Sequence, residues 1–188
     1  MTNNLILIFI GSLNIGGTEK QLLNISKELH EDFKFKIFTV QEKGFLSEKF
    51  EKLGIEVIEP KFKRKKRSIY NIIFFYIFLF IKILKMYLVL KPKVVHYYLP
   101  HSYILGGFLA FFFKKTKYII SRRSLNNYQK KYLFINKIET FLHKRMNIII
   151  ANSEEIKKQL VETEQITENK CKVIYNGISI NQKKKPNK

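Results

Sequence analysis

Short apolar runs recur along the chain, and the gaps between them leave room for one helix each. The runs are rich in β-branched or aromatic residues: Leu5–Ile10, Phe35–Val40, Ile55–Ile58, Lys93–Tyr98, Tyr118–Ser121, Asn147–Ala151 and Lys172–Tyr175. Several are apolar without interruption, which is typical of strands covered on both faces. Helices are expected between them, at residues 18–30, 45–53, 68–90, 102–113, 130–145 and 153–163. This alternation predicts an α/β fold, a Rossmann-like parallel sheet with helices on both faces.

The chain of 188 residues is long enough for one domain, which we place at residues 1–178. Residues 179–188 are polar and basic, and we expect a disordered tail there. The single cysteine, Cys171, excludes an internal disulfide and fits a reducing compartment. The first apolar run lacks the basic flank of a signal peptide, so we interpret it as a core strand.

The net charge of +20 is concentrated in the middle of the chain. Residues 60–148 hold 20 basic residues and one acidic residue, Glu139. Such a block attracts anions, including nucleic acid, acidic lipid headgroups and phosphorylated substrates. With one acidic residue in this block, a glycosidase pair of carboxylates is not expected. The sequence also lacks a cluster of residues with the spacing of metal ligands, so we expect no metal.

The loop GSLNIGGTEK, residues 11–20, follows the first apolar run and contains two adjacent glycines, Gly16 and Gly17. In a doubly wound sheet, ligands bind past the carboxyl ends of the strands, where this loop is expected. Glycines let backbone N–H groups approach a bound group closely, and the N-terminus of the next helix, which holds Glu19, favours an anion. A tight turn without a ligand is the alternative. The spacing fits neither GxGxxG nor a P-loop.

A basic segment followed by a long apolar run is the second informative stretch. Six basic residues lie within Lys61–Arg67, and Ile72–Ile81 is apolar or aromatic throughout. A basic-flanked amphipathic helix on an anionic leaflet, a buried crossover helix and a transmembrane span are the three readings we keep open. Nucleic acid is not an expected partner, because the aromatic residues form solid apolar runs. The membrane-surface candidates are Lys63, Arg64, Lys65, Lys66 and Arg67.

Four segments, in order, resemble the N-terminal half of a retaining glycosyltransferase of family 4 with the GT-B fold. They are FIGSLNIGGTEKQLLNIS with its Gly-Gly-x-Glu signature, VVHYYLPHSYILGGFLA, YIISRRS, and IIIANSEEIKKQLVE followed by KVIYNGI. The resemblance covers residues 5 to about 180. The family's second domain, which holds the donor nucleotide and a Glu-x7-Glu motif, is expected to begin where this chain stops. The chain therefore resembles an acceptor-side half only.

The resemblance also implies which residues form the site. Gly16 and Gly17 would lie against the donor diphosphate or an acceptor phosphate, beside Glu19. Many family members carry His-x-His at the end of the fourth strand, but this chain has Tyr98 at the second position. The histidines that flank it are therefore the candidates for hydrogen bonds to the transferred sugar.

Those histidines are His96 and His101, which we take as the catalytic candidates. The alternative for His96 is a core histidine whose ring nitrogens are hydrogen-bonded within the protein and which has no role in the site. Arg122 and Arg123 end the next strand and could hold a phosphate in bidentate fashion, although one of them is expected to be only a solvated charge.

The resemblance implies an acceptor-binding half of a retaining transferase, which moves a hexose from a nucleotide sugar to a lipid-linked or cell-envelope glycan acceptor. No cofactor is expected, and the half is not expected to be catalytic by itself. The alternative is a non-catalytic membrane-associated subunit that recruits a separate donor-domain chain. Either protein is expected to be bacterial and cytoplasmic, peripheral to the inner face of the cytoplasmic membrane. The tail NQKKKPNK has no apolar periodicity, which favours a fragment over an evolved subunit.

Overall fold

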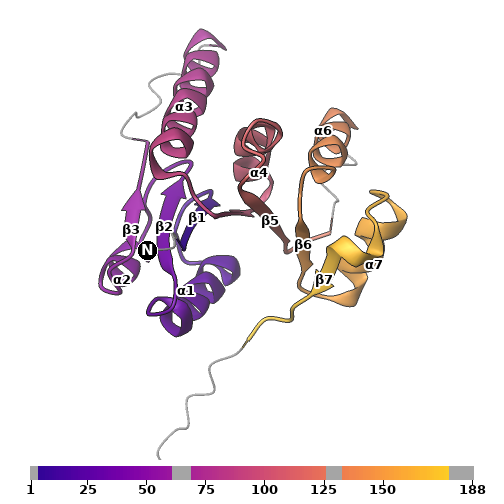
Figure 1. Ribbon diagram of the computed structural model, residues 1–188, viewed down its shortest axis with the longest axis horizontal. Coiled ribbons are helices and arrows are strands. Elements are labelled where there is room, and N and C mark those ends of the chain that lie inside the picture. Colours follow the sequence, from indigo (N-terminus) through magenta and orange to yellow (C-terminus); the bar gives the residue numbers. More distant parts are fainter. Residues whose placement is uncertain (1–3, 61–68, 126–132, 178–188) are drawn as a thin grey trace, which may run out of the picture.

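The computed structural model describes residues 4–60, 69–125 and 133–177, and it contains the strands and helices that the sequence predicts (Figure 1). The strands are β1 (Leu5–Ile10), β2 (Lys34–Thr39), β3 (Glu56–Ile58), β4 (Val94–Tyr98), β5 (Lys117–Arg122), β6 (Ile148–Ala151) and β7 (Cys171–Val173). The helices are α1 (Gly17–Leu29), α2 (Ser47–Glu51), α3 (Ile69–Leu90), α4 (Pro100–Gly107), α6 (Leu133–His143) and α7 (Glu154–Glu162), with 3-10 turns η1 (Phe108–Phe111) and η2 (Glu168–Lys170).

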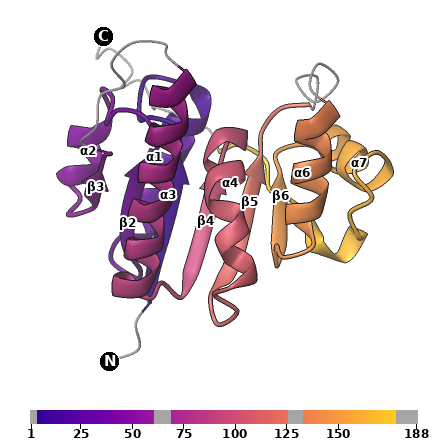
Figure 2. The ribbon, with the colours of Figure 1, turned by 90° about the horizontal axis from the view of Figure 1, so that it is seen from above.

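The strands form one parallel sheet in the order β3-β2-β1-β4-β5-β6-β7. The predicted Rossmann-like α/β fold is therefore confirmed. Helices α3, α4 and α6 cover one face of the sheet, and α1 and α2 cover the other (Figures 1 and 2). Helix α7 packs on the α3 side, because its Ile156 and Leu160 belong to the same core cluster as the buried residues of α3. The strand order reverses between β1 and β4, and the carboxyl ends of strands at such a switch point are where ligands bind in open α/β sheets.

Strand β1 shows why its sequence is apolar at every position. Leu7 and Phe9 belong to the core cluster that also contains buried residues of α3. Ile8 and Ile10, which alternate with them, belong to the second cluster, with buried residues of α1. Successive side chains of a strand point to opposite faces, so a strand covered on both sides needs an uninterrupted apolar run.

Helix α4 packs unusually close to β4. A Cβ atom on Gly106 would lie 2.8 Å from Cε1 of Tyr97, so glycine is required for this approach. The Tyr97 hydroxyl in turn lies 2.7 Å from the Tyr87 hydroxyl of α3, and both side chains are fully buried. This hydrogen bond satisfies two hydroxyl groups inside the core that joins α3, α4 and the sheet.

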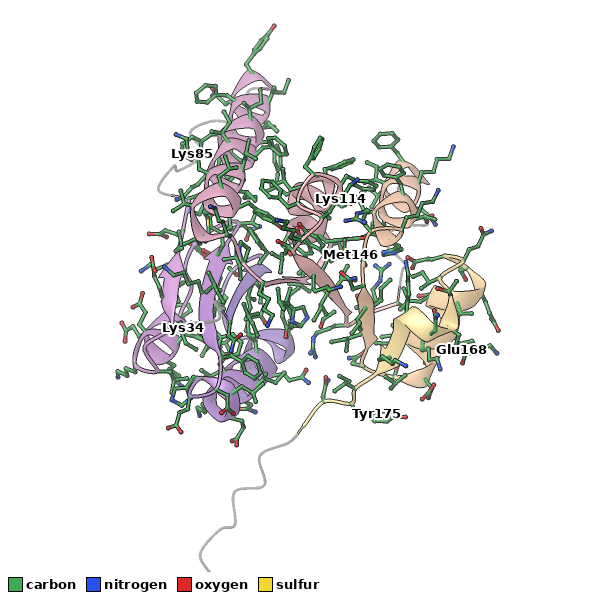
Figure 3. The ribbon with its side chains drawn as sticks, in the orientation of Figure 1. Lys34, Lys85, Lys114, Met146, Glu168 and Tyr175 are labelled. Carbon is green, nitrogen blue, oxygen red and sulfur yellow. The ribbon has the colours of Figure 1, made fainter. Side chains whose placement is uncertain are left out.

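Helix α3 divides into two halves with different surroundings. In its second half, Ile83 and Tyr87 are completely buried against the sheet. In its first half, Tyr70 is 79% exposed and Phe74 is 60% exposed. Figure 3 shows the side chains of this outer part projecting away from the sheet. The crossover-helix interpretation is therefore correct for the second half only.

By length and composition alone, Tyr70–Leu90 could cross a membrane, with a mean hydropathy of 2.3. One side of its second half, which carries Ile83 and Tyr87, belongs to the protein core, however, so lipid could not surround this helix along its whole length. The outer half, residues 70–81, is about 18 Å long at 1.5 Å per residue, which is shorter than the ~30 Å hydrocarbon core of a bilayer. In this arrangement α3 is not a complete transmembrane span.

Helix α7 begins with an N-cap that the sequence indicates, a serine before two glutamates. Ser153 has extended backbone angles, and its Oγ accepts a hydrogen bond from the backbone N–H of Ile156 at 3.3 Å. Glu154 and Glu155 lie in the first turn, where the helix dipole favours negative charge. The cap fixes the direction in which the chain leaves β6.

Candidate functional site

The loop after β1 leads into the exposed N-terminus of α1. Gly16 is the N-cap of this 13-residue helix, with extended backbone angles and without a side-chain cap. A Cβ atom on Gly16 would clash with Oε2 of Glu19, so the carboxylate of Glu19 folds over this glycine. A Cβ atom on Gly17 would meet no atom within 4 Å. The glycine pair thus leaves the positive end of α1 open on one side, which suits an anionic group.

His96 lies in β4, next to Ser121 of the neighbouring strand. Its Nε2 is 2.8 Å from the Ser121 Oγ, and its ring lies against the Tyr98 ring at a tilt of 35°, with centroids 4.2 Å apart. Burial, reinforced by the positive charge of Arg123, lowers the pKa of His96 to about 3. The imidazole is therefore neutral at physiological pH, so it can position a hydroxyl group but does not start a reaction as a charged acid.

Arg123 joins three parts of the fold at the carboxyl edge of the sheet. Its Nη1 donates to Oδ1 of Asn176 at 2.7 Å and also to Oε1 of Gln21 on α1. Its guanidinium carbon lies 5.6 Å from the centre of the Tyr98 ring. Burial lowers the pKa of Arg123, and nearby Tyr98 and Glu19 act in the opposite direction. Arg123 is thus a charged, half-buried group beside the N-terminus of α1.

Arg122 has a different environment, which corrects the expectation that it binds phosphate. Its side chain is 4% exposed, and its Nη2 lies 2.8 and 2.7 Å from the two carboxylate oxygens of Glu164. Glu139 lies 3.4 Å away on the same side. Both carboxylates are fully buried, and His143 completes the cluster with its Nε2 2.9 Å from Glu164. Arg122 is therefore committed to a structural ion cluster, and neither arginine is the solvated charge that we expected.

The loop between β4 and α4 carries a strained residue. Leu99 is the N-cap of α4 and has a φ of 71°, a conformation that L-residues rarely adopt. Such backbone strain costs about 1–3 kcal/mol and is concentrated at functional sites. The backbone of His101 lies in the first turn of α4, two residues further on. The side chain of His101 lies outside the described part of the structure, so its catalytic role stays a prediction.

A cavity of about 1550 Å³ opens beside the loop after β1. Gly11, Ser12 and Glu19 line one end, and the rest runs between the outer half of α3 and α4.

The predicted membrane-surface residues Lys63, Arg64, Lys65, Lys66 and Arg67 lie outside the described residues. Among the described residues, no group of three or more His, Cys, Asp or Glu side chains could hold a metal ion.

The structure adds Tyr98, Ser121, Gln21 and Asn176 to the predicted site. Two of them had a signal in the sequence. Tyr98 is two residues after His96 and therefore shares its face of β4, and Ser121 pairs with Tyr98 in the register of β4 and β5. Gln21 and Asn176 reach Arg123 from α1 and from the segment after β7. No signal in the sequence places Gln21 and Asn176 next to Arg123, and only the folded structure brings them there.

Comparison with known proteins identifies the family and the fold of the chain. The sequence model of Glycosyltransferase Family 4 matches residues 15–182. The fold is similar to Anabaena HepE in complex with UDP-glucose, with a TM-score of 0.73 and 18% identity over 94% of this chain and 45% of HepE. A glycosyltransferase from Rickettsia africae gives a TM-score of 0.60 at 20% identity, covering 94% of this chain and 44% of that one.

MurG from Acinetobacter baumannii gives a TM-score of 0.61 at 12% identity, covering 95% of this chain and 47% of MurG. No curated protein matches the sequence. The chain thus spans somewhat less than half the length of these solved structures. It belongs to glycosyltransferase family 4 and has the Rossmann-like fold of the N-terminal half of a GT-B enzyme.

Proposed function

We propose that this chain is the acceptor-binding half of a retaining glycosyltransferase, which moves a hexose from a nucleotide sugar to a lipid-linked or cell-envelope glycan acceptor. The observation that carries the proposal is the group formed by His96, Tyr98 and Arg123 beside the open N-terminus of α1. A neutral imidazole, a cation and the N–H groups of a helix N-terminus are suited to a sugar linked to a diphosphate.

The proposed roles follow from the surroundings of each residue. Arg123 and the N-terminus of α1 would stabilise negative charge on the departing diphosphate, with no cofactor and no metal. Neutral His96 would accept or donate one hydrogen bond to a sugar hydroxyl, and His101 would do the same from α4. The donor nucleotide would be held mainly by a second domain. Anabaena HepE, whose fold is similar, was solved with UDP-glucose, which supports a nucleotide sugar as the donor.

We also propose that the protein attaches to the inner face of the bacterial cytoplasmic membrane. The exposed outer half of α3 would enter one leaflet, and the basic residues that precede it would meet anionic headgroups. Phe112 and Phe134, which are 78% and 75% exposed, offer further apolar side chains on the α3, α4 and α6 side of the sheet. About 18 Å of helix is long enough to enter one leaflet but not to cross both.

Transfer is tested by joining this chain to the nucleotide-binding half of a family member and following release of UDP from UDP-glucose in the presence of membrane lipids. We expect UDP release, and a product whose anomeric configuration, measured by NMR, is that of the donor. His101→Ala should lower turnover at least tenfold without changing the melting temperature. Unchanged turnover would remove His101 from the site. If no acceptor yields product while the chain still binds a donor-domain partner, the non-catalytic subunit is the better description.

Membrane attachment is tested by flotation with anionic vesicles. Neutral residues at positions 63 to 67 should weaken binding and remove its salt dependence. The matched control also removes five positive charges, from exposed lysines in or beside α1, β2 and α2: Lys20, Lys27, Lys34, Lys49 and Lys52. This control should bind almost as well as the original chain. Equal losses in both variants would show that only total charge matters and would refute a defined membrane-facing side.

A further inference from the structure

We propose that the groove between α3 and α4 binds a single hydrocarbon chain of the acceptor, with the acceptor sugar held at its polar end. This inference deepens the proposed function and rests on it. The cavity of about 1550 Å³ exceeds the usual size of a small-molecule site, which is roughly 300–1,000 Å³. It extends from the loop after β1, beside the candidate site, to the outer half of α3.

The walls of the groove are apolar on both sides. Helix α3 contributes residues at helical spacing, including Ile73, Tyr76, Ile77 and Phe80. Residues three or four apart lie on the same face of a helix, so this wall is a continuous stripe about 10 Å long. Helix α4 and η1 supply the facing wall, with Leu105 and Phe108.

The end of the groove at the site is polar and acidic. Glu19, Glu42 and Glu59 line it, together with Ser12 and the backbone of Gly11. The carboxylates of Glu42 and Glu59, which are not part of the proposed diphosphate site at α1, accept hydrogen bonds from hydroxyl groups and repel an anionic headgroup at this end of the groove. The polar end therefore suits the hydroxyl groups of a sugar, and it disfavours a fatty acid or a bare lipid phosphate.

The opposite end of the groove, at Ile72 and Ile73, adjoins an exposed apolar part of α3. Tyr70 and Phe74 lie there, 79% and 60% exposed, on the part of α3 that would enter the membrane. A chain anchored in a leaflet could thus enter the groove without crossing water, while its sugar reaches the loop after β1. An amphiphile with one long apolar chain and an uncharged sugar head is the occupant that fits both ends.

Binding is tested on the purified chain with decyl β-glucoside that carries a photoreactive diazirine at the end of its chain, used below its micelle concentration. We expect saturable binding, with cross-links on α3 and α4 located by mass spectrometry. Methyl β-glucoside, which lacks the chain, and decanoate, whose head is anionic, should each bind at least tenfold more weakly. Cross-links spread over the whole protein, or equal binding of decanoate, would overturn the proposal.

A matched pair of variants separates groove binding from adhesion to any apolar surface. Ile77 lines the groove and is 53% exposed, whereas Ile81, one turn later, is 45% exposed and lies outside the lining. Ile77→Asp should weaken binding of the glucoside at least tenfold, and Ile81→Asp should change it less than twofold. Both variants should weaken vesicle binding to a similar extent. Equal loss of glucoside binding in both would show that the chain merely coats the helix.

The binding measurement does not depend on catalysis. If glycosyl transfer fails but the glucoside binds in the groove, the transferase proposal is at fault and the lipid site remains. If the glucoside does not bind while a water-soluble acceptor is glycosylated, the groove proposal is wrong and the transferase proposal remains. A second copy of the chain is the competing occupant of the groove, and sedimentation velocity of the chain alone tests for it. A dimer that is dissociated by Ile77→Asp but preserved by Ile81→Asp would assign the groove to that second copy and overturn the proposal.

Discussion

Replacing Arg122 by methionine would leave two buried carboxylates without their cation. Glu164 and Glu139 are fully buried, and both oxygens of Glu164 accept hydrogen bonds from Arg122 at 2.7 and 2.8 Å. Removing one partner of a buried ion pair costs about 3–5 kcal/mol, because the remaining charge is desolvated and uncompensated. The total stability of a domain is about 5–15 kcal/mol, so this single change removes a large part of it.

The assays are equilibrium unfolding in urea, which gives the free energy of unfolding, and thermal unfolding, which gives Tm, both followed by circular dichroism. For a domain of this length, each kcal/mol corresponds to about 2–4 °C, so Arg122→Met should lower Tm by about 10 °C. The control is Lys117→Met, at the exposed beginning of the same strand, which should change stability by less than about 0.5 kcal/mol. Adding Glu164→Gln to Arg122→Met should recover part of the lost unfolding free energy, because it neutralises one of the two buried carboxylates that Arg122 contacts.

A loss of less than about 1 kcal/mol for Arg122→Met, or a loss equal to that of the control, would refute the structural assignment of Arg122. So would a variant that keeps its stability but no longer binds an anionic ligand. That second outcome would restore the expectation, drawn from the resemblance, that Arg122 holds a phosphate.

Three further predictions concern other parts of the molecule. Arg123→Met should lower the affinity for UDP-glucose in the two-domain enzyme at least tenfold, with a smaller stability loss than Arg122→Met; equal affinity in titration calorimetry would contradict the proposed role. Because the pKa of His96 is about 3 in the folded protein and about 6.5 when unfolded, unfolded chains take up the proton first as pH falls. Stability should therefore fall by about 1 kcal/mol from pH 7 to pH 5, a value reduced for the partial exposure of the ring, and His96→Asn should flatten this dependence in urea titrations at each pH. Ser153→Ala should cost about 1 kcal/mol through loss of the helix cap, and an unchanged midpoint of urea unfolding would contradict it.

Much of the fold could be predicted because its signals are local. Apolar runs such as Leu5–Ile10 marked the strands to within two residues, since a strand covered on both faces must be apolar at every position. Serine at position 153 marked the start of α7 by the same kind of local chemistry. Burial was harder to predict, because it depends on contacts between elements that are distant in the sequence. The sequence of α3 is almost uniformly apolar, so it carries no mark of where burial ends and exposure begins.

The candidate site shows the same division. The sequence determined that glycines, a histidine and arginines would gather at the carboxyl edge of a parallel sheet, because strand direction places the strand ends together. It did not separate Arg122 from Arg123, which have identical side chains in adjacent positions. Only the tertiary structure decided this, because Glu164, distant in sequence, folds against one arginine and Asn176 lies beside the other. A buried charge requires a partner, and the partner is chosen by packing between elements rather than by local sequence.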